Sequence, residues 1–190
     1  MEYILIIISA VFINNIVFAQ FLGICPFLGV SNRMSTAIGM GSAVTFVLVL
    51  STILTFLMYT YILDPLNLGY LQTISYILLI ASLVQMIEIM LKKVSPPLYQ
   101  ALGVFLPLIT VNCAILGVAI LVIQNNQNLL QATTLAVGTG LSFTFAITLF
   151  ASLREQMELV NVPKGMRGMP IALVTIGILA LAFMGFAGLV

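Results

Sequence analysis

The sequence lacks tryptophan and histidine altogether, and it has very few charged residues. Only 6% of its 190 residues are charged and 62% are hydrophobic, whereas about a quarter of the residues of soluble globular domains are charged. This composition excludes the soluble globular class and indicates an integral membrane protein, whose backbone polar groups are satisfied within helices. The chain has no basic patch for nucleic acid and no acidic tail, so the partner that composition does indicate is the lipid bilayer.

Six apolar segments follow one another along the chain, and each is at least as long as the roughly 20 residues that a helix needs to span a bilayer. They cover Ile4–Val30, Ala37–Leu63, Leu71–Leu91, Leu98–Ile123, Leu129–Leu153 and Ile171–Val190. Turn-forming residues such as Asp64-Pro65 separate them. We therefore predict an all-α integral membrane fold with six transmembrane helices in a single membrane domain, residues 1–190.

The cationic residues are confined to alternate connections between these segments. Arg33 follows the first segment, Lys92 and Lys93 follow the third, and Arg154, Lys164 and Arg167 follow the fifth. Loops rich in lysine and arginine stay on the cytoplasmic side of a membrane. The pattern predicts that the loops with Arg33, Lys92/Lys93 and Arg154–Arg167 are cytoplasmic and that both termini face outward.

Two motifs occur twice in the chain. The only two cysteines, Cys25 and Cys113, each begin the motif C-x-x-L-G-V, and they lie 88 positions apart. The motif G-x-G-x-x-x-T-F occurs at 39–46 and again at 138–145. With three spans in each copy, the second copy must enter the membrane from the opposite side. We therefore predict a 3+3 inverted-topology repeat, with repeat one at 1–95 and repeat two at 96–190.

Spans one and four contain residues that interrupt helices, and both cysteines lie among them. Gly23 and Pro26 flank Cys25, and Pro107 precedes Cys113. Proline removes a backbone donor and bends or ends a helix, and matching interruptions in two inverted halves indicate a site near the bilayer midplane. We predict that spans one and four are broken at the cysteines, and that the two thiols share a task although a lone apolar-segment cysteine is usually only a small buried hydrophobe.

Two thiols without histidine restrict the chemistry of such a site. A structural disulfide inside lipid is unusual, zinc normally takes four nitrogen or sulfur ligands, and an iron-sulfur cluster takes four thiolates. A cluster would therefore lie at an interface, with a second chain donating the other pair of ligands. The neighbours Asn112, Thr110, Gly23 and Pro26 are candidates for the groups around the thiols, although Asn112 and Thr110 equally suit the satisfaction of broken backbone.

Several stretches carry a resemblance to a known family. They are N-N-I-V at 14–17, F-L-G-I-C-P-F-L-G-V-S at 21–31, T-A-I-G-M-G at 36–41, L-G-V-F-L-P-L-I-T-V-N-C-A-I-L-G-V-A at 102–119, V-P-K-G-M-R-G at 162–168 and A-F-M-G-F-A-G-L at 182–189. The whole chain resembles the RnfA subunits of the Rnf complexes, the membrane-bound ion-translocating ferredoxin:NAD oxidoreductases. Its C-P-F at 25–27 favours RnfA over the related NqrE subunits of sodium-pumping quinone reductases, which remain an alternative.

This resemblance implies a cofactor, partners and a location. Cys25 and Cys113 are expected to bind a 2Fe-2S cluster together with two cysteines of the sister subunit RnfE, which has the opposite membrane orientation. The other expected partners are the Rnf subunits B, C, D and G, which include a ferredoxin-accepting iron-sulfur protein and flavin-bearing proteins. The chain is then an electron-transfer subunit of a translocase in a bacterial or archaeal cytoplasmic membrane, moving Na+ or H+, with no catalytic residues of its own.

The sequence also supports an alternative function, and further residues in it have local roles. A small inverted-repeat transporter or channel with no redox centre fits the duplication equally well, and it would be colourless when purified. Glu88 lies deep enough in the third span to suggest an ion or proton site. Because Lys92 is four residues further along the same predicted helix, we interpret the two instead as a favourable helical pair. The G-x-G pairs at 39–41 and 138–140 indicate close helix packing.

Overall fold

The computed structural model describes residues 2–66, 68–94, 96, 99–100, 103, 106–160, 163 and 165–185, and its secondary structure over these residues is helical throughout. The α-helices are α1 (Glu2–Ile8), α2 (Ile24–Val30), α3 (Met34–Met58), α4 (Asp64–Leu66), α5 (Gln72–Val94), α7 (Leu106–Thr110), α8 (Cys113–Gln124), α9 (Leu129–Leu159) and α10 (Met169–Met184). Two π-helices, η1 (Ser9–Ile13) and η2 (Tyr59–Leu63), and the 3-10 helix η3 (Gly69–Leu71) join them. The prediction of an all-α fold is confirmed.

Four helical stretches of the described residues are long and apolar enough to cross a membrane: Met34–Leu66, Gly69–Val94, Pro107–Gln124 and Leu129–Met157. The apolar helices Tyr3–Ile13 and Met169–Met184 are shorter, and they lie in the first and sixth predicted spans, the latter of which ends outside the described residues. The chain is therefore a multi-pass membrane protein, while the number of six spans stays a prediction.

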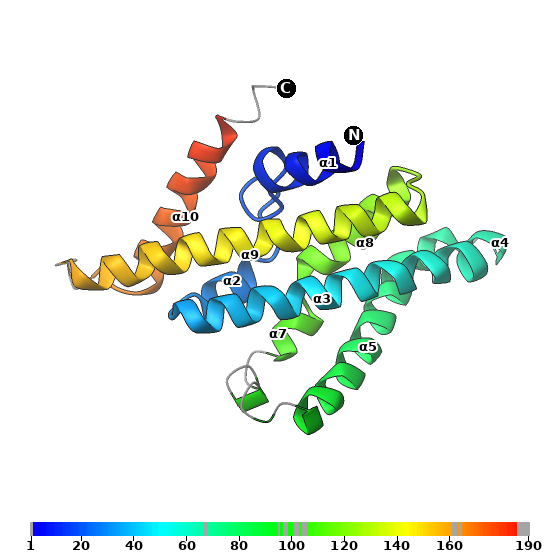
Figure 1. The fold of residues 1–190 in the computed structure, drawn as a ribbon, viewed down its shortest axis with the longest axis horizontal. Coiled ribbons are helices and arrows are strands. Elements are labelled where there is room, and N and C mark those ends of the chain that lie inside the picture. The colour runs from blue at the N-terminus through cyan, green and yellow to red at the C-terminus, as the bar shows by residue number, and fades with distance from the viewer. Residues whose placement is uncertain are drawn as a thin grey trace.

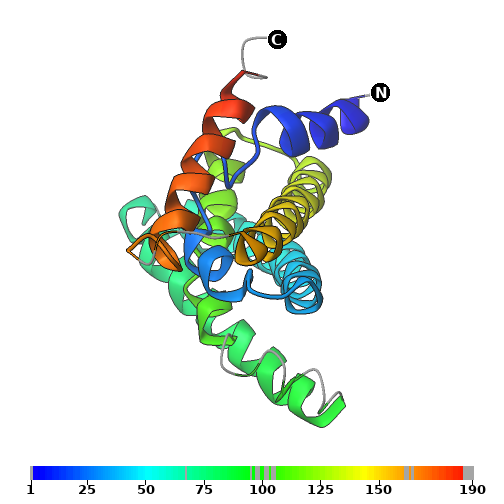
Figure 2. The ribbon, with the colours of Figure 1, turned by 90° about the vertical axis from the view of Figure 1, so that its left-hand side faces the viewer.

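Helices α3 and α9 form the centre of the molecule (Figures 1 and 2). They lie side by side and run in opposite directions, while α5 and α10 diverge from opposite ends of the pair. Buried side chains on the two helices include Met40, Val44 and Leu48 on α3 and Phe143 and Ile147 on α9. Several polar side chains at this depth find partners in the backbone: Thr52, for example, donates to the carbonyl of Leu48 at 2.8 Å. The buried hydroxyl of Ser142 on α9, by contrast, has no hydrogen-bond partner.

The two helices meet through a reciprocal pair of contacts. A Cβ atom on Gly41 would lie 2.7 Å from Cγ2 of Thr144, and one on Gly140 would lie 2.5 Å from Cγ2 of Thr45. The hydroxyl oxygens of Thr45 and Thr144, 99 positions apart, are 3.3 Å from each other. Each glycine therefore makes room for a threonine of the other helix, as small residues do where membrane helices approach closely. By contrast, no atom lies within 4 Å of a Cβ built on Gly39.

The predicted helical pair of Glu88 and Lys92 is not formed. No ion pair joins the two side chains within the part of the chain that the structure describes. The Lys92 Nζ atom lies instead 5.7 Å from the centroid of the Tyr99 ring, a geometry in which the ring face attracts the cation. An exposed lysine in the last turn of α5 is free to turn toward this aromatic ring, which sequence spacing along one helix does not reveal.

Candidate functional site

The two cysteine stretches are both irregular before they become helical. After η1 ends at Ile13 the chain follows a turn-rich path to α2, and Phe21 and Gly23 adopt positive φ angles of 55° and 82° on the way. Helix α7 ends at Thr110 and α8 begins at Cys113. Cys25 is therefore the second residue of α2, and Cys113 is the first residue of α8.

One hydrogen bond joins the two stretches directly. The backbone N–H of Gly23 donates to the Sγ atom of Cys113 at 2.9 Å, across 90 positions of sequence. A Cβ atom on Gly23 would lie 3.0 Å from the Phe143 ring and 3.4 Å from Oδ1 of Asn112. Since the φ angle of Gly23 is also one that favours glycine, no other residue fits here without strain. The fold thus brings Gly23, one of the predicted neighbours, against the more distant of the two cysteines.

Asn112 satisfies backbone at the second interruption. Its Oδ1 atom accepts a hydrogen bond from the N–H of Ala114 at 3.0 Å and so caps the N-terminus of α8. This is one of the two roles predicted for Asn112. The side chain is 3% exposed, yet its Nδ2 atom, although buried, has no hydrogen-bond partner. The Nδ2 group beside Cys113 can therefore still donate a hydrogen bond. A buried N–H group without an acceptor costs free energy of folding unless a further group accepts from it.

Helix α2 is held in place by residues that sequence reasoning did not single out for this role. The buried ring of Phe27 stacks on Phe150 of α9, with centroids 4.7 Å apart. One turn further along α9, Nη1 of Arg154 donates to the Leu28 carbonyl at 3.1 Å and to the Ser31 hydroxyl at 3.0 Å. A cation at the last carbonyls of a helix is favourable. Only the three-dimensional packing of α2 on α9 reveals these contacts, because the residues lie more than 120 positions apart in the chain.

The two free thiols could provide two of the four ligands that a metal centre usually takes. Both cysteines are free; Cys25 is exposed and Cys113 is partly exposed, so both reach the surface of the chain. The described residues contain no group of three or more His, Cys, Asp or Glu side chains that could hold a metal ion. Of the other predicted neighbours, Pro26 is buried within α2, and Thr110 is the last residue of α7. A metal centre at these thiols therefore fits only if a second chain completes it.

Several apolar helices long enough to cross the bilayer define a multi-pass membrane protein. Residues 3–190 match the family described as "Rnf-Nqr subunit, membrane protein". The chain belongs to this family, as its motifs predicted.

Similar proteins match the chain over nearly their full length, and they carry consistent names. The chain is 58% identical, over 100% of its length and 98% of the relative's, to the A subunit of the Na(+)-translocating ferredoxin:NAD(+) oxidoreductase complex of Acetobacterium woodii. It is 56% identical to the A subunit of the ion-translocating oxidoreductase complex of Syntrophotalea carbinolica, over 98% of the chain and 96% of that protein. For the protein of the same name from Alcanivorax borkumensis, the identity is 53% over 100% of the chain and 98% of the relative.

Proposed function

We propose that the chain is the RnfA component of an ion-translocating ferredoxin:NAD oxidoreductase complex, and that Cys25 and Cys113 provide half of the ligands of a 2Fe-2S cluster shared with the sister subunit RnfE. Relatives that are more than half identical over nearly their whole length, and that carry the name of this component, support the first part. The hydrogen bond from Gly23 to Cys113 carries the second part, because it brings the two cysteine stretches together. When bound, such a cluster accepts and releases one electron at a time.

The chain's own residues prepare this site in distinct ways. Asn112 begins α8, so that Cys113 sits at the positive end of a 12-residue helix, where a thiolate is stabilised. Gly23 adds a backbone donor to the same sulfur. The rings of Phe27 and Phe150, together with Arg154, fix the short helix that carries Cys25. The side chain of Cys25, which is exposed, is left free to face another chain of the complex.

The topology we propose is a 3+3 inverted repeat of six spans, with spans one and four broken at the cysteines. The reciprocal contacts of Gly41 with Thr144 and of Gly140 with Thr45 support it, since a pseudo-two-fold axis between α3 and α9 exchanges the two contacts. The antiparallel course of α3 and α9 also agrees with such an axis (Figure 1). In this topology the cationic loops are cytoplasmic, and both termini face outward from the cytoplasmic membrane.

The expected partners follow from the same proposal. RnfE supplies the other two cysteines, and Rnf subunits B, C, D and G complete the path from ferredoxin to NAD. The pair that this chain forms with RnfE, purified without oxygen, should absorb in the visible range, contain iron and give a 2Fe-2S EPR signal on partial reduction. A colourless, iron-free pair would favour the alternative, a transporter or channel with incidental cysteines.

A substitution at Gly23 tests the role of its amide. In Gly23→Ala, the methyl group meets the Phe143 ring and the strained φ angle moves the N–H away from Cys113. Hydrogen bonds to cluster sulfurs stabilise the reduced state, so the midpoint potential should become more negative, by roughly 40 mV if the bond favours that state by about 1 kcal/mol. Redox titration followed by EPR measures the shift.

The matched control for this prediction is Gly39→Ala, whose added methyl group meets no atom within 4 Å. It should leave the potential unchanged. An unshifted potential in a well-assembled Gly23→Ala complex contradicts the role of the amide but not the cluster. If Gly23→Ala does not assemble, wild-type complex labelled with 15N-glycine serves instead. A hyperfine coupling between the cluster spin and a glycine nitrogen is then expected, and the absence of any such coupling excludes the contact.

A further inference from the structure

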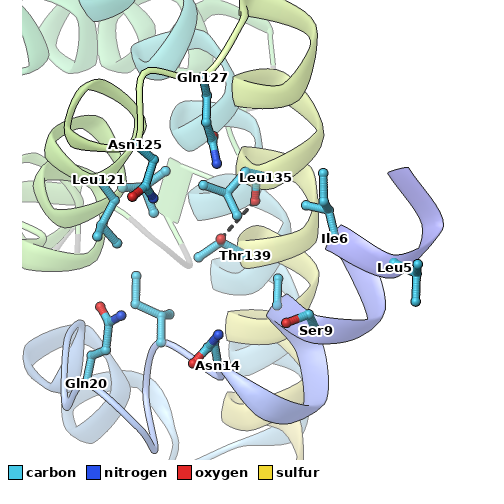
Figure 3. A pocket seen from close by; sticks show the side chains of 13 residues that line it. Leu5, Ile6, Ser9, Asn14, Gln20, Leu121, Asn125, Gln127, Leu135 and Thr139 are labelled. Carbon is cyan, nitrogen blue, oxygen red and sulfur yellow. Dashed lines mark hydrogen bonds between the residues drawn. The ribbon is translucent and has the colours of Figure 1, made fainter. Parts of the chain in front are cut away.

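A cavity of about 470 Å³ lies between the N-terminal segment, α8 and the first half of α9. Figure 3 shows polar side chains from several elements around the same space. They are Ser9, Asn14, Gln20, Asn125, Gln127 and Thr139, and the remaining lining residues are apolar. None of the lining residues is ionisable. The cavity therefore offers neutral oxygen and nitrogen groups within a chain that is otherwise strongly apolar.

Two helix C-termini meet at this cavity. The C-cap of η1 is Asn14 and the C-cap of α8 is Asn125, and both line the cavity. The C-terminal end of a helix carries partial negative charge and favours a cation. In transporters of the inverted-repeat kind, the C-terminal ends of interrupted helices and the carbonyl groups of unwound backbone coordinate cations in this way. The electrostatics of the backbone thus select a positive ligand even though no carboxylate is present.

The side chains add oxygen ligands of suitable kinds. The Oε1 atom of Gln127 is buried and has no hydrogen-bond partner in the chain, which is costly unless a ligand or water completes it. The Thr139 hydroxyl donates its proton to the Leu135 carbonyl at 2.8 Å, so its oxygen lone pairs are left to accept. Since divalent cations prefer carboxylates and an anion would need a lysine or arginine, a monovalent cation suits this lining best.

The position of the cavity gives it an approach from one side. Asn125 and Gln127 precede α9, at the opposite end of that helix from Arg154 and the cationic loop after it. At its other end the cavity reaches Gln20, in the interrupted stretch that leads to Gly23, and Val118 on α8. The volume is large enough for an ion together with several waters, since a water occupies about 30 Å³ of liquid.

We propose that this cavity binds a partly hydrated monovalent cation, for which Na+ serves as the probe, entering from the face opposite the cationic loops. The ligands are the oxygens of Gln127, Thr139 and Asn14, assisted by the two helix C-termini. The proposal rests on the cavity of this chain alone and requires no cluster.

Protection of an introduced thiol tests the proposal in the whole complex, without turnover. Asn125→Cys is placed at the exposed edge of the cavity, and its alkylation by a membrane-impermeant maleimide is timed in Na+ or in choline at equal ionic strength, with wild-type complex as the baseline for the native cysteines. The rate should fall along a binding curve, by about tenfold at ten times the dissociation constant. Tyr70→Cys, at a residue that is 79% exposed and does not line the cavity, should react equally in both cations.

Substitutions in the lining then separate ion binding from general effects. Thr139→Val and Gln127→Leu, each added to Asn125→Cys, should raise the Na+ concentration for half protection about tenfold, which corresponds to one lost ligand of about 1.4 kcal/mol. The matched control is Thr133→Val on the same helix, whose hydroxyl donates to the Leu130 carbonyl and does not line the cavity. If Asn125→Cys does not assemble or react, Gln20→Cys is the second probe. Equal rates in Na+ and choline, or no reaction at either probe, overturn the proposal and leave the cluster assignment untouched.

Discussion

Complexes carrying Cys113→Ser should lose the 2Fe-2S signal that this chain shares with RnfE and nearly all ferredoxin-dependent NAD reduction. A serine hydroxyl is not deprotonated near neutral pH and does not replace a thiolate as an iron ligand. Loss of a group that only supports a ligand typically costs about 10-fold to 100-fold in metal affinity or activity, so loss of the ligand itself should exceed about 100-fold. EPR, iron analysis and NADH formation measure the three consequences on the same preparation.

Two comparisons make this prediction specific. Cys25→Ser should give the same loss, because each thiol supplies one ligand to a shared centre. Ile120→Ser adds a hydroxyl to α8 at another partly exposed position, and it should leave iron content and activity close to those of the wild type. If both cysteine variants assemble with RnfE and retain the signal, the thiols are not ligands and the transporter alternative gains support.

The predictable part of this protein is the part that depends on local composition. Apolar runs predicted the helices, and the G-x-G-x-x-x-T-F motifs located the residues through which α3 and α9 meet, Thr45 and Thr144 among them. Even so, only Gly41 of the first pair makes the close contact, while Gly39 meets no atom. A motif marks which segments are related, but the direction in which each Cα faces depends on how the helices cross.

Contacts between distant segments could not be derived in this way. The hydrogen bond from Gly23 to Cys113 forms because two irregular stretches meet in space. The hydrogen bonds from Arg154 to α2 form because α2 packs against α9. In the sequence, Asn14 and Gln20 only indicate an interrupted span. Their position around a cavity with Gln127 and Thr139 follows from three segments that come together in space.

Gly140→Ala should strongly reduce the amount of protein that assembles and the thermal stability of what assembles. The new Cβ would lie 2.5 Å from Cγ2 and 2.9 Å from Cβ of Thr45, and an atom next to the backbone cannot rotate away. The helices α3 and α9 must therefore separate at the centre of the molecule, and overpacking of this kind costs about 1–3 kcal/mol. Fluorescence-detected size exclusion after heating measures the loss.

The pseudo-two-fold relation between α3 and α9 predicts that the reciprocal substitution has the same effect. In Gly41→Ala the new Cβ would lie 2.7 Å from Cγ2 of Thr144, so the loss of assembled protein and of thermal stability should be similar to that of Gly140→Ala. In each case, replacing the opposing threonine by alanine should restore much of the stability. The rescuing pairs are Gly140→Ala with Thr45→Ala, and Gly41→Ala with Thr144→Ala. Gly39→Ala lies two residues from Gly41 in open space and should be neutral or slightly stabilising, since alanine is a better helix former than glycine by about 1 kcal/mol. If Gly140→Ala is as stable as Gly39→Ala, or if only one of the two reciprocal variants is damaged, α3 and α9 do not pack as equivalent halves and the inverted repeat loses its main support.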